Sequence, residues 1–140
     1  MRRVLTILLV DDDETTNFLH QRLLGRLNAA DQVLVATNGQ KALEILAHPD
    51  SRFGPANPVL VLLDINMPVM NGFEFLVAFQ ALPLARQQGA VVVILTSSLS
   101  PQDLGRASTL PIAGFLDKPL DQEKINTLLT LHFGPLVAAG

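Results

Sequence analysis

The stretch Pro58-Val-Leu-Val-Leu-Leu-Asp64 decides the fold, because a short run of apolar residues ends abruptly in an acid. Ile65-Asn66-Met67-Pro68 follows it directly. A run that is apolar at every position is typical of a central parallel strand covered by helices on both faces. Open α/β sheets bind their ligands at the carboxyl ends of such strands. The sequence therefore predicts that Asp64 lies at the mouth of a buried strand and is the reaction centre.

The first apolar run ends in the same way. Val4-Leu-Thr-Ile-Leu-Leu-Val10 leads directly into Asp11, Asp12 and Asp13. If the two strands are neighbours, several carboxylates meet at one edge of the sheet. Two carboxylates about 4 Å apart repel by roughly 4 kcal/mol at an effective dielectric constant near 20, so the cluster needs a raised pKa or a cation. Oxygen ligands with no Cys or His nearby in the sequence favour Mg²⁺ or Mn²⁺ over zinc.

Strand-like and helix-like segments alternate along the rest of the chain. Further strands are predicted over residues 32–37, 91–96 and 114–116. Helices are predicted over residues 14–27, 38–47, 72–82, a short segment after Ser100, and 121–133. Alternation with short connections implies right-handed crossovers. The sequence predicts an α/β fold with a flavodoxin-like, doubly wound, five-stranded parallel sheet in the order 2-1-3-4-5 and five helices.

Several residues mark the faces and ends of these helices. Leucines 19, 23 and 27 recur at four-residue spacing and predict the apolar face of the first helix. Asp13 is predicted to cap that helix, and Asn71 with Glu74 resembles a capping box. Pro83 is predicted to end the helix that follows Asn71. His20, His48 and His132 have no ligand spacing and are predicted to be solvated or packed.

The composition excludes several classes of protein. With 140 residues, one domain is expected over residues 1–140, with a core over about 4–133 and a short C-terminal tail. No Cys is present, which excludes disulfides and thiolate zinc sites. A net charge of −3 with scattered basic residues gives no footprint for direct nucleic-acid binding. No apolar run approaches the roughly 20 residues of a membrane span, so we expect a cytoplasmic protein.

Two more residues end strands at the edge where Asp64 is expected. Thr96 closes one strand and offers a hydroxyl, and Lys118 follows the last strand and offers a positive charge. A carboxylate nucleophile, a metal ion, a hydroxyl and an ammonium group together suit the transfer of a phosphoryl group. Because Pro119 follows Lys118, the sequence also allows a cis peptide at this bond.

Taken together, these pieces resemble the response-regulator receiver domain of two-component signalling, of the single-domain, chemotaxis-regulator type. The resemblance covers nearly the whole chain and rests on Val10-Asp-Asp-Asp13, Leu63-Asp-Ile-Asn-Met-Pro68, Asn71-Gly72, Ile94-Leu-Thr-Ser97 and Leu116-Asp-Lys-Pro119. The chain departs from the family pattern in Leu110-Pro-Ile-Ala113, where Ala-x-x-x-Gly-Ala is usual.

The resemblance assigns a role to each matching position. It implies that Asp64 is the phosphoacceptor and that the metal ligands are Asp12 directly, Asp11 through water, Asp64, and the backbone carbonyl of Asn66. It implies that Thr96 and Lys118 contact the phosphoryl oxygens. Phe115 falls on the aromatic switch position, where many members have tyrosine. Asn66 and Ser98 fall on the two positions that tune dephosphorylation.

The implied partners are a sensor histidine kinase or a histidine phosphotransfer protein, and a downstream protein target. The target is expected on the face formed by the helix after Ser100, strand 114–116 and helix 121–133. The implied protein is a switch and not an enzyme, apart from autophosphorylation by small phosphodonors and autodephosphorylation.

Three other functions remain open at this point. A haloacid-dehalogenase-like aspartyl phosphatase also uses an aspartate on a parallel strand with Mg²⁺, but its nucleophile follows the first strand in an Asp-x-Asp motif. A flavin-binding carrier of the flavodoxin type has a phosphate-cradling loop after strand one, where this chain has acids. A receiver that only binds proteins and is not phosphorylated is disfavoured, because every expected site residue is present.

Overall fold

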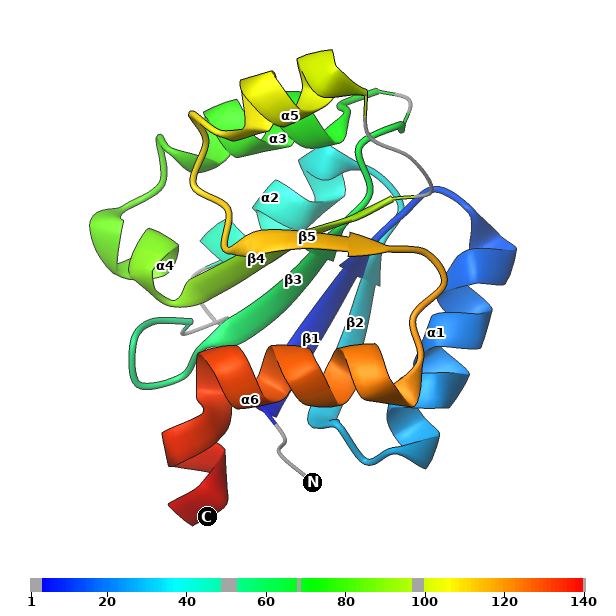
Figure 1. Cartoon of the computed structure of the whole chain (residues 1–140). Coiled ribbons are helices and arrows are strands. Elements are labelled where there is room, and N and C mark those ends of the chain that lie inside the picture. The colour runs from blue at the N-terminus through cyan, green and yellow to red at the C-terminus, as the bar shows by residue number, and fades with distance from the viewer. Residues whose placement is uncertain (1–3, 49–52, 68, 97–99, 140) are drawn as a thin grey trace.

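The sheet has the predicted order. The computed structural model describes residues 4–48, 53–67, 69–96 and 100–139, with side chains described from Thr6 to His132 within these ranges. Its five strands are all parallel and lie in the order β2-β1-β3-β4-β5 (Figure 1). They are β1 Val4–Val10, β2 Ala30–Ala36, β3 Val59–Leu63, β4 Ala90–Thr96 and β5 Gly114–Asp117. The central strand β3 is buried at every position, as its uninterrupted apolar sequence predicts.

Helices cover both faces of this sheet. They are α1 Glu14–Arg26, α2 Gly39–Ala47, α3 Gly72–Phe79, α4 Leu84–Gln88, α5 Pro101–Ala107 and α6 Gln122–Ala139. Figure 1 shows α2, α3 and α5 on one face and α1 and α6 on the other. Alternate residues of each strand point to opposite faces, so two apolar cores form. Leu8 and Val61 belong to the core under α2 and α3, and Ile7 and Leu60 to the core under α1 and α6.

The predicted count of five helices is wrong, because the described residues contain six. The predicted helix over 72–82 ends at Phe79, and a turn carries the chain to Pro83, the N-cap of α4. Helix α4 is only 5 residues long, too short for a hydrophobic repeat to reveal it in the sequence. The last helix also continues past its predicted end, to Ala139. No helix in the described part of the chain is long and apolar enough to span a bilayer.

Helix α1 packs through a different face from the predicted one. Leu19 is 56% exposed, whereas the buried positions are Asn17, His20 and Leu24. Leu23 and Leu27 are only partly buried at the border of the core. The pattern of leucines was misleading because Asn17 and His20 are polar but make hydrogen bonds inside the protein, which lowers the cost of burying them.

The predicted caps are present. Asp13 is the N-cap of α1, where its carboxylate accepts a hydrogen bond from Thr15 N. Asn71 and Glu74 form a capping box at the start of α3. Asn38 caps α2, and Ser100 caps α5 with proline in its first turn. The helix that follows each of these caps therefore begins at a defined residue, which places the loops at the carboxyl edge of the sheet.

Candidate functional site

The register of the sheet brings the two acidic strand ends together. Val10 of β1 pairs with Leu63 of β3, so Asp11 and Asp64 each lie one residue beyond a paired position. The backbone N–H of Asp64 donates to the carbonyl of Val10 at 2.8 Å. Carboxylate oxygens of Asp11, Asp12 and Asp64 all lie within 4.8 Å of one another. This cluster lies where the apolar runs predicted it, and its three carboxylates could hold a metal ion.

Lys118 lies between two of these carboxylates. Its Nζ is 2.6 Å from Asp11 Oδ2 and 3.6 Å from Asp64 Oδ1. Both aspartates are buried, and the lysine side chain is 18% exposed. The positive charge reaches the cluster because β5 ends beside β4, where Asp117 pairs with Thr96 and the N–H of Lys118 donates to the Thr96 carbonyl at 2.9 Å.

Burial and charge shift the pKa values of these groups. Burial raises the pKa of Asp64; Lys118 opposes this rise, and the negative charges of Asp11 and Asp12 add to it. Burial alone lowers the pKa of Lys118, but its hydrogen bond to Asp11 and the charges of Asp11 and Asp64 outweigh burial, so the pKa of Lys118 is raised. The lysine is therefore fully charged at neutral pH and partly neutralises the cluster.

The other predicted site residues lie around this centre. Thr96 is buried at the end of β4, and Asn66 is exposed just beyond Asp64. The backbone N–H of Asn66 donates to the Asp64 carboxylate. Phe115 in β5 is paired with Ile94 and is 38% exposed. Ser98 lies outside the described residues, so the structure does not place it.

The loop between β3 and α3 is held tightly against the end of β3. The N–H of Gly72 donates to the Ile65 carbonyl at 2.9 Å. A Cβ at Gly72 would lie 2.7 Å from the carbonyl oxygen of Asp64 and 2.9 Å from Ile65 Cα, so this position requires glycine. Val69 in the same loop has a φ of 69°, in the left-handed region that a β-branched residue rarely adopts.

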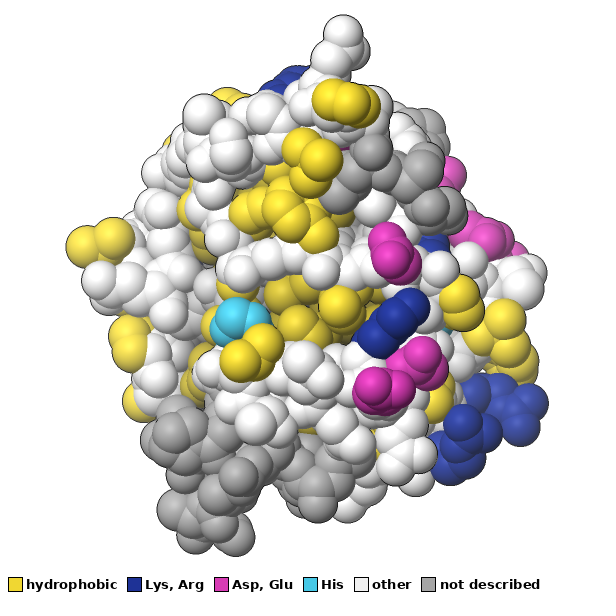
Figure 2. Space-filling model, in the orientation of Figure 1, with side chains coloured by type: hydrophobic (Ala, Val, Ile, Leu, Met, Phe, Trp, Pro, Cys, Tyr) yellow, Lys and Arg dark blue, Asp and Glu magenta, His cyan; other side chains and the backbone are white. Residues whose placement is uncertain are grey.

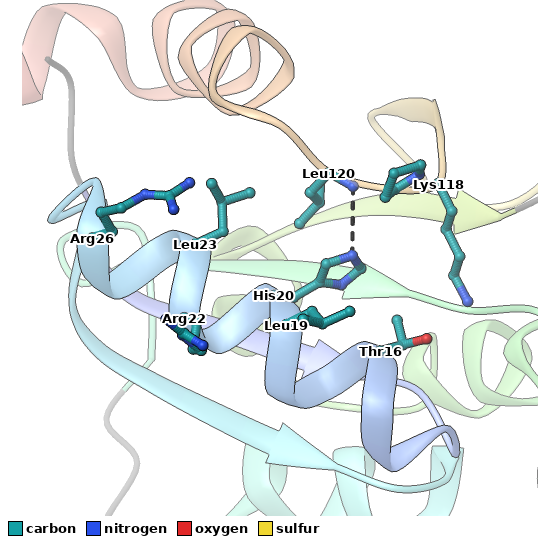
Figure 3. A pocket seen from close by; sticks show the side chains of 9 residues that line it. Thr16, Leu19, His20, Arg22, Leu23, Arg26, Lys118 and Leu120 are labelled. Carbon is teal, nitrogen blue, oxygen red and sulfur yellow. Dashed lines mark hydrogen bonds between the residues drawn. The ribbon is translucent and has the colours of Figure 1, made fainter.

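A groove of about 650 Å³ runs along α1 beside the loop that follows β5. Figure 3 shows His20 pointing from α1 toward Leu120, whose backbone N–H donates to His20 Nε2 at 3.5 Å, the outer limit of a hydrogen bond. The peptide between Lys118 and Pro119 is cis, as the sequence allows. Burial, with a smaller contribution from Lys118, lowers the pKa of His20. His20 is thus a packed histidine, one of the two fates predicted for it.

Comparison with known proteins decides the family. The model of the response regulator receiver domain matches residues 7–130. The chain belongs to the response-regulator receiver family. Receiver domains of response regulators accept phosphoryl groups from histidine kinases. The family and the predicted fold agree, and nothing in the comparisons favours the phosphatase, the flavin carrier or the interaction-only receiver.

Individual relatives support this assignment. The receiver is 34% identical over 119 residues to the probable methanogenesis regulatory protein FilR2 of Methanothrix harundinacea, over 85% of this chain and 75% of that protein. It is 30% identical over 130 residues to the probable chemotaxis protein CheY of Rhizobium etli, over 93% of both chains. A crystal structure of a two-component response regulator from Cytophaga hutchinsonii matches with a TM-score of 0.79 and 27% identity, over 93% of this chain and 97% of that one. The chain is also 31% identical to a longer relative, the transcriptional regulatory protein MalR of Bacillus subtilis, but it spans only 49% of that protein's length.

The positions of two residues near the receiver site were missed by sequence reasoning. Asn17 donates from Nδ2 to the carbonyl oxygen of Asp11 at 2.8 Å, and His20 contacts the loop after Lys118. The available signal was their place in α1. Asn17 and His20 are three residues apart, and Leu24 follows His20 by four residues, which is the spacing of a buried helical face. The polar character of both residues hid that face.

Proposed function

We propose that this receiver accepts a phosphoryl group on Asp64, in a reaction that depends on Mg²⁺, from a sensor histidine kinase or a histidine phosphotransfer protein. The observation that carries the proposal is the Asp64 carboxylate, whose side chain is 10% exposed and which lies beside two further carboxylates and the Lys118 ammonium group. A carboxylate oxygen of Asp64 attacks the phosphorus of the donor. The phosphorus–nitrogen bond of the phosphohistidine breaks, the imidazole leaves, and an acyl phosphate forms.

The residues present fit a hard divalent cation. Asp11, Asp12 and Asp64 offer only oxygen ligands, and their oxygens already lie within 4.8 Å of one another. We propose that these three carboxylates and the backbone carbonyl of Asn66 hold Mg²⁺, with Mn²⁺ as a substitute. The ion supplies positive charge that offsets the carboxylates and the oxygens of the transferred group.

Thr96 and Lys118 complete the proposed site. The Lys118 ammonium group lies 3.6 Å from Asp64 Oδ1, close enough to contact a phosphoryl oxygen attached there. The Thr96 hydroxyl is proposed to contact another phosphoryl oxygen. Both residues carry charged or polar groups at strand ends. The backbone hydrogen bond from Lys118 to Thr96 joins β5 to β4 at this point.

Asn66 and Ser98 are proposed to set the lifetime of the phosphorylated state. An amide and a hydroxyl can orient a water molecule but cannot take its proton effectively near neutral pH. Hydrolysis is therefore expected to depend on geometry and access. Substituting both residues with alanine should change the decay rate of the acyl phosphate while leaving phosphorylation intact, and an unchanged lifetime would show that the two positions are wrongly assigned.

Phosphorylation is proposed to reach a downstream protein through the face formed by α5, β5 and α6. When Thr96 moves toward the phosphoryl group, Phe115 can turn inward, and its partly exposed ring has area left to bury. Because phenylalanine has no hydroxyl, this burial needs no polar partner. Beryllofluoride with Mg²⁺ should shift the amide resonances of Phe115 and residues 100–107. Shifts confined to the carboxylate cluster would contradict the switch.

We propose no direct contact with nucleic acid or membrane, and a cytoplasmic location shared with the proposed phosphodonors. On the face seen in Figure 2, Lys and Arg side chains form small separate groups, one of them over α1. A continuous basic surface of the kind that binds nucleic acid is not seen on that face. We propose a switch and not a phosphatase, because the expected product is one equivalent of acyl phosphate per chain.

Intact-mass spectrometry tests the proposal. Incubation with acetyl phosphate and Mg²⁺ should add one phosphoryl group that hydroxylamine removes, as expected of an acyl phosphate. Asp64→Asn should abolish the addition, because an amide oxygen is a poor nucleophile. The matched control is Asp117→Asn, which changes an exposed aspartate at the end of β5. Undiminished labelling of Asp64→Asn, mapped to another residue, would refute the assignment of the phosphoacceptor.

A further inference from the structure

Asn17 is a buried polar residue in α1, and neither the predicted roles nor the family match assigns it one. As a whole residue it is 5% exposed. Its Nδ2 donates to the main-chain carbonyl oxygen of Asp11 at 2.8 Å, in a buried hydrogen bond between residues six positions apart. The opposite assignment of the amide atoms would place two oxygens in contact, so the donor is Nδ2. Asn17 thus contacts the turn that carries the acidic residues.

The carboxylate of Asp11 does not need Asn17 to hold it. Asp11 Oδ1 accepts from the backbone N–H of Asp13 at 2.9 Å, and Asp11 Oδ2 accepts from Lys118 Nζ at 2.6 Å. The backbone N–H of Asp11 donates to the Ala36 carbonyl at 3.1 Å. The hydrogen bond from Asn17 engages the carbonyl of Asp11, which is the one remaining polar main-chain group of that residue.

Asp12 is in a different situation. It is exposed, and within the described part of the chain its carboxylate makes no hydrogen bond or ion pair. Among the described residues, the backbone is therefore what restricts where this carboxylate can point. The carbonyl of Asp11 and the N–H of Asp12 belong to one planar peptide unit, so a bond that fixes the first also fixes the second. Holding that plane restricts the direction in which the Asp12 side chain leaves the main chain.

We propose that Asn17 is a positioning residue, which fixes the peptide between Asp11 and Asp12 and thereby holds the Asp12 carboxylate in place for the metal ion. The inference rests on the proposed Mg²⁺ site. It extends that site to a residue that touches neither the ion nor the phosphoryl group.

The oxygen atom of the Asn17 amide group supports this role. Asn17 Oδ1 is buried and has no hydrogen-bond partner among the described residues. An unpaired buried oxygen costs folding free energy, so a purely stabilising residue at this position would be apolar. Leucine has the same number of side-chain heavy atoms and the same branching as asparagine, and it lacks this oxygen. Replacing Asn17 with leucine should therefore weaken the binding of Mg²⁺ without a matching loss of stability.

The test uses the whole chain and the variants Asn17→Leu and Asn17→Ser, the serine being too short to reach the Asp11 carbonyl. The control is Gln21→Leu, one turn later on α1, where an exposed side chain lines, together with Asp12 and Asn17, a pocket distinct from the groove beside the loop after β5. Calorimetric titration with Mg²⁺ should show a dissociation constant raised about 10- to 100-fold in both Asn17 variants and unchanged in the control. In the metal-free protein, the amide resonance of Asp12 should shift.

The melting temperature of metal-free Asn17→Leu should stay within about 4 °C of the unchanged protein. Mg²⁺ affinity within about twofold of the unchanged protein, in either folded variant, overturns the inference. So does a loss of affinity accompanied by a broad fall in melting temperature and amide shifts throughout the sheet, because that result describes a structural residue. If Asn17→Leu does not fold, the serine variant decides. Failure of the unchanged protein to bind Mg²⁺ refutes the proposed metal site itself, whereas normal binding by both Asn17 variants refutes only the role of Asn17.

Discussion

Removing the Lys118 ammonium group should destabilise the metal-free receiver strongly at neutral pH. The Nζ atom lies 2.6 Å from Asp11 Oδ2 and 3.6 Å from Asp64 Oδ1, and all three side chains are largely buried. Lys118→Met keeps most of the length and apolar area of the side chain and removes only the charge. The variant then holds two buried carboxylates with no cation between them.

The distances give the magnitude. At an effective dielectric constant near 20, a unit charge pair attracts by about 6 kcal/mol at 2.6 Å and about 5 kcal/mol at 3.6 Å. Protonation of a carboxyl group and entry of water limit the loss. Breaking a buried pair by removing one partner typically costs about 3–5 kcal/mol, and we expect Lys118→Met to lose this much free energy of unfolding.

The loss should depend on pH in a defined direction. The raised pKa of Lys118 means that its contribution is complete below the unfolded value, about 10.4, and disappears only as the pH rises through the higher folded value. The raised pKa of Asp64 means that its ionisation weakens the fold as the pH rises above about 3.9. Lys118→Met should therefore be most destabilised at pH 7 to 8 and should approach the unchanged protein as the carboxyl groups protonate.

Urea unfolding followed by far-ultraviolet circular dichroism measures this effect, since the chain has no Trp or Tyr for fluorescence. The control is Lys41→Met, which removes an exposed lysine whose ammonium group bonds only the Thr37 hydroxyl among the described residues, and it should change stability by less than about 0.5 kcal/mol. Equal loss at pH 5 and pH 7.5 would show that Lys118 stabilises by packing. Unchanged stability at pH 7.5 would refute the charge argument entirely.

Three further changes test the loops and the phosphoacceptor. Val69→Asn should raise the free energy of unfolding by about 1 kcal/mol in urea titrations, because asparagine tolerates a φ of 69° and the valine is 78% exposed; no gain would mean that the loop is unstrained. Gly72→Ala should lower the free energy of unfolding by about 1–3 kcal/mol and slow phosphorylation by acetyl phosphate, because its methyl group would lie 2.7 Å from the Asp64 carbonyl oxygen. Normal stability and a normal phosphorylation rate would contradict that contact. Asp64→Asn should be more stable than the unchanged protein at pH 7 and equal to it well below pH 3.9, because asparagine lacks the ionisation that burial disfavours. A difference in stability that persists in acid would show that ionisation of Asp64 is not its cause.

The sheet and the cluster could be predicted because both follow from short-range patterns. Apolar runs that end in acids mark the carboxyl ends of buried strands, and parallel geometry places Asp11 beside Asp64 once β1 and β3 are neighbours. The alternation of strands and helices and the handedness of crossovers limit the sheet to a few doubly wound topologies, of which the order 2-1-3-4-5 is the simplest for five strands. These inferences need no knowledge of individual side-chain contacts.

The missed features depend on contacts between distant parts of the chain. The face of α1 was misread because the amide that bonds His20 belongs to Leu120, 100 residues away, and the sequence carries no sign of that pairing. Asn17 has a partner only because the turn after β1 points the Asp11 carbonyl at α1. Helix α4 is too short to show periodicity and is defined by the turn at Pro83. Such features depend on tertiary packing, which overrides local preference.

The site draws its residues from the carboxyl ends of the strands, while the longest connection, between α2 and β3, lies at the opposite end of the sheet (Figure 1). The turn at Pro55 and Ala56, just before β3, is exposed and belongs to that opposite end. Doubling the length of a flexible loop costs only about 0.6 kcal/mol. This turn is therefore a suitable attachment point for a fluorescent label or an inserted reporter domain, which would leave the carboxylate cluster and the face with Phe115 open to partners.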